Sequence, residues 1–324
     1  MRALIHTEFG DPTEVLEVGE RPLPEPGPGE VRVRTVLAPI HNHDLWTIRG
    51  DYGFKPELPA GSGSEAMGIV DALGDGVEGL QVGQRVTGGT FGAWAEYFTA
   101  KASGLVPVPD TMSDETAAQL MSMPFSALAL LESLEVESGD WIVQNTANGM
   151  VGKLVAQFAP ARGIRVLGLV RRQAAVDELA ALGIRDVVST DSPGWRDRVA
   201  EILDGARPRA AVDSVGGTAA GRLLSLLGDG GTLISFGAMG SEMLQLSAGD
   251  LIFRGTTVKG FWATTAARSI DPATRGALFG ELLRAVGSGE IDLPVGEVFP
   301  FEQARAAAAA SAEPGREGKI LLRF

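Results

Sequence analysis

Apolar and polar positions follow two different periods along this chain. Residues 31–35 read V-R-V-R-T, and this alternation is typical of a strand with one buried face. Further short apolar runs, at residues 67–73 and 85–87, are interrupted by glycines. Many short strands separated by Gly and Pro turns predict a compact, barrel-like β domain in the first part of the chain.

The pattern changes near residue 113. Residues 114–135 have helical spacing, and from Trp141 to Phe236 apolar strand-like runs alternate with amphipathic helical ones. Such alternation predicts repeated βαβ units and a parallel sheet covered on both faces. Two further helices, at 275–286 and in the Ala-rich stretch 302–311, precede a closing strand at 319–324.

Composition narrows the class of protein. The 324 residues suit two domains, and the formal charge of -13 argues against a nucleic-acid surface or a polybasic membrane contact. Cys is absent, which excludes a disulfide, a thiolate nucleophile and Cys-ligated zinc. No signal-peptide pattern and no window of eighteen apolar residues is present, so we expect a cytoplasmic protein without a membrane span.

One apolar run ends in a turn of small residues. The stretch W-I-V-Q-N-T-A-N-G-M-V-G-K-L-V starts at Trp141 and has the spacing of the dinucleotide fingerprint, with Ala147 at the first Gly position. Small residues let the backbone approach a pyrophosphate, which then faces the free N–H groups of the next helix. Because a predicted strand precedes the turn and a predicted helix follows it, we expect dinucleotide contacts at Asn148, Gly149, Met150, Val151 and Gly152.

The end of the next apolar run indicates which dinucleotide binds. NAD sites usually place Asp or Glu there, to accept a hydrogen bond from the ribose 2′-OH. This chain instead has Arg171 and Arg172, whose guanidinium groups suit a 2′-phosphate. The alternative is that both arginines are only solvated at a helix start. The sequence therefore predicts NADP(H) as the cofactor.

These residues and several others resemble the medium-chain dehydrogenase/reductase superfamily, in its zinc-free quinone-reductase and enoyl-thioester-reductase branch. The resemblance covers nearly the whole chain, and trans-2-enoyl-thioester reductases of the mitochondrial type are the most similar group. It implies a GroES-like β domain at residues 1–118 and 263–324, with a Rossmann domain inserted at 119–262. The matching segments are M-R-A-L-I-H at the start, G-P-G-E-V-R-V-R at Gly27, I-R-G-D-Y-G-F-K-P-E-L-P-A at Ile48, G-S-E at Gly63, Q-N-T-A-N-G-M-V-G at Gln144 and V-K-G-F-W at Val258.

The resemblance also implies site residues. Tyr52 stands where enoyl-thioester reductases have their proposed catalytic Tyr, and His43 is a second candidate for moving a proton, alone or paired with Asp44. The alternative for Tyr52 is that it packs a loop onto the barrel. For Phe91, Trp94, Phe261 and Trp262 the equally open alternative is ordinary core packing. Further cofactor contacts are expected at Phe236, Gly237, Phe261 and Trp262, and substrate-pocket contacts at His41, Phe91 and Trp94.

Zinc alcohol dehydrogenases of the same superfamily have C-x-x-D followed by G-H-E. Here the Cys position is His41 and the second motif reads Gly63-Ser64-Glu65, while the third ligand would fall near Ser122. A catalytic zinc site needs three protein ligands and an open position, and serines are poor ligands. We therefore expect no metal, with His41 and Glu65 as the only possible residual ligands.

The sequence leaves several functions open. The leading hypothesis is an NADPH-dependent reductase of an activated C=C bond, most like the enoyl-thioester reductases. A quinone or enone reductase, an alcohol dehydrogenase and an NADPH-binding protein without turnover are the alternatives. The expected partner is a small-molecule substrate, without nucleic acid or membrane. A homodimer is expected because the family often pairs nucleotide-domain edge strands, here around residues 256–260.

Overall fold

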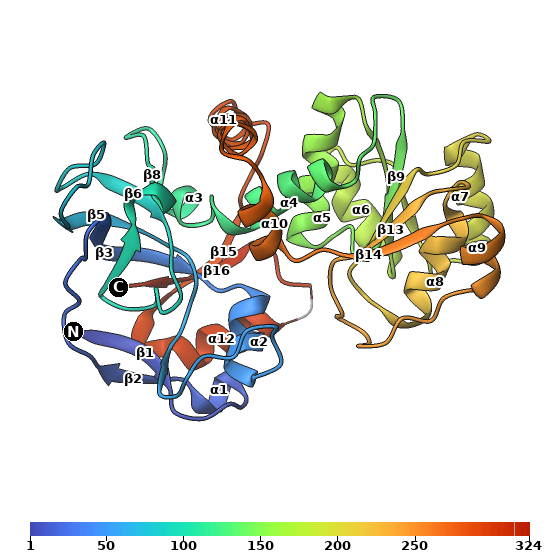
Figure 1. The fold of residues 1–324 in the computed structure, drawn as a ribbon. Helices are drawn as coiled ribbons and strands as arrows, with labels where there is room; N and C mark the ends of the chain where they lie inside the picture. The colour runs from blue at the N-terminus through green and yellow to red at the C-terminus, as the bar shows by residue number, and fades with distance from the viewer. Residues whose placement is uncertain (314) are drawn as a thin grey trace. The chain divides into compact units, whose positions relative to one another are not determined.

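The computed structural model describes residues 1–313 and 315–324 and divides the chain into two compact units. The first unit contains Met1–Ser122 and Asp292–Phe324, and the second contains Met123–Ile291. Both ends of the chain, blue and red in Figure 1, thus contribute to the same unit. No helix in the described residues combines the length and the apolar character needed to cross a membrane.

The first unit is built on two sheets. The smaller one has the order β2-β1-β4, and the larger one has the order β15-β16-β3-β5-β6-β8, with β7 also paired to β3. β16, from the end of the chain, pairs antiparallel with β3. The strands are β1 (Arg2–His6), β2 (Glu17–Glu20), β3 (Glu30–Pro39), β4 (Ala60–Gly61), β5 (Ala66–Leu73), β6 (Arg85–Gly88), β7 (Tyr97–Lys101), β8 (Val106–Pro107), β15 (Val295–Pro300) and β16 (Lys319–Arg323).

The alternation in β3 places this strand on the core. Val31, Val33 and Thr35 are buried, whereas Arg34 is exposed, as the period of two predicts. The buried side joins a core that includes Leu4, Trp94 and Phe301. Short helices complete the unit: α1 (Pro12–Val15), α2 (Asn42–Arg49), α3 (Asp114–Ala118) and α12 (Ala304–Ala312), with 3-10 turns η1 (Ala102–Gly104) and η3 (Phe301–Gln303).

The second unit contains a parallel sheet, which confirms the predicted βαβ pattern. Its strand order is β11-β10-β9-β12-β13-β14, so the connections run one way from β9 to β11 and the other way from β12 to β14. The switch point of the sheet therefore lies between β9 and β12, where such folds bind ligands. The strands are β9 (Trp141–Gln144), β10 (Arg165–Val170), β11 (Val187–Ser189), β12 (Ala210–Asp213), β13 (Thr232–Ser235) and β14 (Thr257–Gly260).

Alternate residues along the strands of this sheet pack against different helices. Leu167 and Leu169 share a core with residues of α7 and α8, whereas Val170 packs with residues of α6. Burial on both faces explains why these strands read as continuous apolar runs. The helices are α4 (Ser122–Ser133), α5 (Met150–Phe158), α6 (Gln173–Ala181), α7 (Trp195–Leu203), α8 (Gly217–Leu226), α9 (Ala248–Phe253), α10 (Ala263–Ser269) and α11 (Pro272–Gly287), with η2 (Ala159–Arg162).

The boundaries of the compact units differ from those expected from the sequence. The chain returns to the first unit at Asp292, not at residue 263. The reason is that α11 packs within the second unit. Its Phe279 stacks on Phe125 of α4 with ring centroids 4.7 Å apart, and its Glu281 pairs with Arg162 at 2.8 Å.

Candidate functional site

In the tight turn between β9 and α5, the backbone at Thr146 lies close to the backbone at Gly149 and Gly152. Gly149 donates its N–H to the carbonyl of Thr146 at 2.7 Å, and Thr146 has a positive φ of 47°. A Cβ on Gly152 would lie 2.8 Å from the Thr146 oxygen, so only glycine fits at this position. The N–H groups of the first turn of α5 are left without partners inside the helix and can face an anionic group.

The Ala at the first position of the fingerprint is accommodated by another glycine. A Cβ on Gly168 of β10 would lie only 2.8 Å from the Cβ of Ala147. The methyl group of Ala147 thus occupies space that Gly168 leaves open on the neighbouring strand. The departure from Gly at position 147 therefore does not disturb the turn.

Two polar residues missed by the sequence analysis hold the switch point together. Asn145 follows β9 and donates from Nδ2 to Oδ1 of Asp213 at 2.5 Å, while its Oδ1 accepts from the Ser214 N–H at 2.7 Å. The second Asp213 oxygen accepts from the N–H of Gly216 at 2.9 Å. Asp213 ends β12 and is fully buried. Only the pairing of β9 with β12 shows that these two residues meet.

The predicted cofactor residues lie at one edge of this sheet. Arg171 and Arg172 follow β10, both are exposed, and Arg172 is the N-cap residue of α6. Phe236 and Gly237 follow β13, while Phe261 and Trp262 follow β14. Because the carboxyl ends of parallel strands share one edge, the structure brings all of these residues to the edge that carries the β9–α5 turn. The rings of Phe236 and Phe261 have centroids 5.8 Å apart.

In the first unit, Tyr52 and His43 lie together. Tyr52 follows α2, which ends at Gly50 with a φ of 82°. The rings of His43 and Tyr52 have centroids 5.9 Å apart, and Nε2 of His43 is 2.7 Å from the Ser64 hydroxyl. The nearest Asp44 oxygen is 3.6 Å from Nε2 of His43, because the carboxylate of Asp44 accepts the His41 backbone N–H instead. The two residues therefore do not form a hydrogen-bonded acid–base pair.

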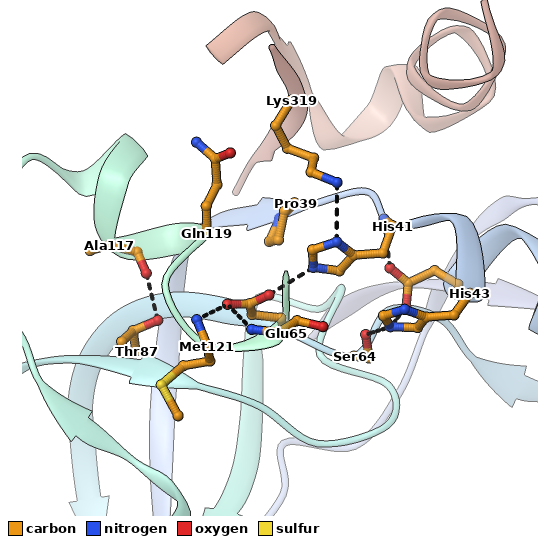
Figure 2. A network of polar contacts seen from close by, with 12 residues as sticks. Pro39, His41, His43, Ser64, Glu65, Thr87, Ala117, Gln119, Met121 and Lys319 are labelled. Carbon is orange, nitrogen blue, oxygen red and sulfur yellow. Dashed lines mark hydrogen bonds and ion pairs between the residues drawn. The ribbon is translucent and has the colours of Figure 1, made fainter. Parts of the chain in front are cut away.

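A chain of buried polar groups lies behind this cluster, and Figure 2 shows its members. Nε2 of His41 is 2.7 Å from Oε2 of Glu65, and Nδ1 of His41 is 3.2 Å from Nζ of Lys319. Oε1 of Glu65 accepts the backbone N–H groups of Met121 and Ser122 at 2.7 and 3.2 Å. His41 also stacks on His43, with ring centroids 5.0 Å apart and planes at 18°.

Burial shifts the pKa values of the three titratable groups in this network, Glu65, Lys319 and His41. It raises the pKa of Glu65 to about 7, against the opposing effect of the two backbone N–H groups. It lowers the pKa of Lys319 to about 8, and the neighbouring Arg316 adds to that effect. The pKa of His41 falls well below its usual value because of burial and of the Lys319 charge. Between about pH 7 and 8, Glu65 and Lys319 are thus both charged around a neutral His41.

The residues at the zinc-ligand positions of the superfamily do not fit zinc. Both ring nitrogens of His41 are engaged, and Glu65 already accepts three hydrogen bonds. Ser64 stands at the His position and is bonded to His43. Within residues 1–313 and 315–324, no three His, Cys, Asp or Glu side chains are grouped to hold a metal ion.

The aromatic and imidazole groups expected in a substrate pocket divide into two sets. His41 and Trp94 have no exposed surface, so neither reaches a substrate in this structure. Trp94 packs in the core of the first unit, and its Nε1 donates to the Pro39 carbonyl at 3.2 Å. Phe91 is 39% exposed and meets Phe54, 46% exposed, edge to face with centroids 5.2 Å apart. Lys319 and Phe54 had no signal in the sequence beyond their residue type.

Comparison with known proteins shows the family of the chain. Residues 27–110 match the family described as alcohol dehydrogenase GroES-like domain, and residues 151–275 match the family described as zinc-binding dehydrogenase. The sequence is 31% identical to the mitochondrial enoyl-acyl-carrier-protein reductase of Homo sapiens, with 99% of this chain and 88% of the human chain covered.

Solved structures of quinone oxidoreductases are similar to this protein over its whole length. The quinone oxidoreductase of Pseudomonas syringae has a TM-score of 0.89 and 27% identity, with 100% of this chain and 99% of that chain covered. The Escherichia coli quinone oxidoreductase complexed with NADPH has a TM-score of 0.89 and 25% identity, with both chains fully covered. These relatives are oxidoreductases. The chain belongs to the medium-chain dehydrogenase/reductase superfamily, in its zinc-independent reductase branch.

Proposed function

We propose that this protein is an NADPH-dependent reductase of an activated C=C bond, most like the trans-2-enoyl-thioester reductases. The observation that carries the proposal is the placement of Tyr52 beside His43, whose Nε2 in turn contacts the Ser64 hydroxyl. The relatives named as enoyl-acyl-carrier-protein reductases and as quinone oxidoreductases support the reaction class.

The cofactor site belongs to the second unit. NADP(H) bound at the β9–α5 turn would supply a hydride. Gly149 and Gly152 would let the turn hold the pyrophosphate, and Arg171 and Arg172 would bind the 2′-phosphate through charge-assisted hydrogen bonds. The E. coli relative, a complex with NADPH, supports this assignment.

The first unit supplies the polar groups. When hydride reaches the β-carbon of an enoyl thioester, negative charge develops on the thioester oxygen and the α-carbon must receive a proton. The phenol of Tyr52, neutral at neutral pH, can donate a hydrogen bond to that oxygen, or it can give its proton to the α-carbon and become a phenolate. The ring of His43 lies beside that of Tyr52, and Nε2 of His43 contacts the Ser64 hydroxyl. Phe91, with Phe54, offers an apolar contact for the substrate.

The experiment follows NADPH absorbance with the purified protein against crotonyl- and hexenoyl-coenzyme A, a benzoquinone and a simple enone. One oriented donor at a developing oxyanion is worth about 10²–10³ in turnover. Tyr52→Phe should therefore lose about that factor in kcat with the enoyl thioesters, whereas Tyr97→Phe, on β7, should keep the wild-type rate. Unchanged enoyl-thioester turnover in Tyr52→Phe would refute the role of Tyr52.

The second candidate is a quinone or enone reductase, which the fold similarity to two quinone oxidoreductases favours. Hydride transfer to a quinone needs little help from a proton donor, so Tyr52→Phe would leave it intact. Activity confined to the quinone or the enone would select this candidate.

We also propose that the protein is a homodimer. β14 is at the edge of its sheet, with its outer hydrogen-bonding groups open to another strand. Ile252 and Phe253, just before it, are 70% and 86% exposed, which is unusual for large apolar side chains. A second copy pairing at β14 would cover both features.

A further inference from the structure

Lys319, His41 and Glu65 form a buried row of hydrogen bonds in the first unit. The charges of Lys319 and Glu65 at its two ends decide which atom donates in each hydrogen bond. Lys319 in its ammonium form has only N–H donors, so Nδ1 of His41, 3.2 Å away, must accept. Nε2 of His41 must then carry the ring proton and donate it to Oε2 of Glu65 at 2.7 Å. Glu65 as a carboxylate has only acceptors, and its other oxygen takes the Met121 and Ser122 N–H groups. The contacts of His41 with Lys319 and Glu65 thus each join a donor to an acceptor, and the two charges balance.

We propose that Lys319 is a positioning residue of the active site: it keeps His41 neutral and protonated on Nε2, and through the His41–His43 stack it holds His43 and Tyr52. The role in turnover rests on the proposed function, whereas the protonation state of His41 does not. Lys319 begins β16, the last strand, and lies 278 residues from His41 along the chain. The geometry around Tyr52 thus depends on the returning C-terminal segment.

The stacking explains how a buried group acts on an accessible one. The rings of His41 and His43 are nearly parallel, 5.0 Å apart, and the His43 ring is 5.9 Å from that of Tyr52. A positive charge on His41 would repel a proton from His43 and would alter the packing of the stacked face. The groups that face His41 are Lys319, Glu65, His43, Asp44 and Arg316. Beyond burial, Lys319, His43 and Arg316 lower the pKa of His41, and Asp44 opposes them.

An opposite arrangement has the same number of protons. In it, Glu65 would be a carboxylic acid donating to Nε2, and Nδ1–H would donate to a neutral Lys319 amine. The charged arrangement is favoured because the carboxylate of Glu65 receives two backbone N–H groups as well as His41. The order of proton affinities, with Lys319 near 8 and Glu65 near 7 in pKa, agrees. The two arrangements place the ring proton of His41 on different nitrogens.

The test is NMR of the full-length protein labelled with ¹⁵N-histidine. The chain has 3 histidines, so single substitutions assign every imidazole signal. At pH 7.5, His41 should show a protonated Nε2 and an unprotonated Nδ1. In Lys319→Met, which keeps most of the length of the side chain but removes its charge, the site should take up a proton and His41 should become protonated on both nitrogens. Lys319→Arg should keep the wild-type pattern.

A second variant separates charge from packing. Lys319→Met combined with Glu65→Gln removes both charges, so His41 should be neutral again. A protonated Nδ1 in neutral wild-type His41, or a neutral His41 in Lys319→Met, would overturn the proposal whether or not the enzyme turns over. These signals also show whether each variant is folded.

Turnover tests the positioning itself. Lys319→Met should lower kcat on the acceptor that the wild type reduces by about tenfold to a hundredfold, since small displacements of reacting groups have effects of that size. The KM for NADPH should stay within twofold, because the nucleotide turn belongs to the other unit. An unchanged kcat in Lys319→Met would overturn the positioning role. If the wild type reduces no acceptor while the His41 signals are as stated, the proposed function fails and the assignment of His41 stands.

Discussion

Asn145 and Asp213 join the carboxyl ends of β9 and β12 through a side-chain hydrogen bond of 2.5 Å. The contact lies at the point where the order of the parallel sheet reverses. Asn145 directly precedes the turn that we assign to the dinucleotide, and Asp213 directly precedes the loop to α8. The pair therefore couples the stability of the sheet to the shape of the nucleotide turn.

Asp213→Ala should lower both stability and nucleotide affinity. It removes the acceptor of Asn145 and of the Val215 and Gly216 N–H groups inside the protein, and unsatisfied buried donors cost about 1–3 kcal/mol each. We expect the free energy of unfolding, measured with denaturant, to fall by at least about 2 kcal/mol. The Kd for NADPH should rise. Asp186→Ala, on an exposed residue before β11, is the control, and an equal effect of both variants would contradict the prediction.

Arg171→Ala should raise the KM for NADPH much more than the KM for NADH. A hydrogen bond to a charged group contributes about 1.5–3 kcal/mol, which corresponds to roughly ten- to a hundredfold in affinity. Steady-state kinetics with both cofactors measure the difference. Arg185→Ala is a matched control, because Arg185 is also exposed but precedes β11, at the opposite edge of the sheet. Equal effects of Arg171→Ala on NADPH and NADH would mean that Arg171 is only solvated.

The lowered pKa of Lys319 predicts how stability depends on pH. Its pKa is about 8 in the folded protein and 10.5 ordinarily, so the unfolded chain binds more protons between these values. Stability should therefore rise with pH from about 8 to 10.5 relative to Lys319→Met. The full gain is up to roughly 3 kcal/mol at about 1.4 kcal/mol per pH unit. Unfolding free energies of both proteins at several pH values measure it, and a constant difference would show that Lys319 is not buried as described.

Phe253→Asp should convert a dimer into a monomer. Phe253 is 86% exposed beside the edge strand β14, and a carboxylate buried in an interface there would be costly. Light scattering after size exclusion should give about twice the chain mass of 33.9 kDa for the wild type and that mass for the variant. Val82→Asp, at an exposed position of the first unit, should remain dimeric. A wild-type mass of one chain would remove the dimer proposal.

Local sequence patterns were sufficient to predict those features in which the residues in contact are also close in sequence. The alternation at residues 31–35 predicts the buried side of β3, and the strand–turn–helix at residues 141–158 is found as β9 and α5. The period of side chains in a strand or helix depends only on the backbone, and the glycines of a tight turn depend only on the few residues around them. The positions of Arg171 and Arg172 after β10 follow from the same reasoning.

Contacts between distant segments decided the rest. Nothing near Lys319 in the sequence shows that it meets His41, and nothing near Trp94 shows that it is core and not pocket. The return of the chain to the first unit at Asp292 depends on the packing of α11 against α4 and η2. Burial, and with it the proton affinity of a side chain, is a property of everything packed around that side chain. The sequence by itself thus determined the succession of strands and helices and the nucleotide turn. Only the tertiary structure decided which polar groups lie near Tyr52.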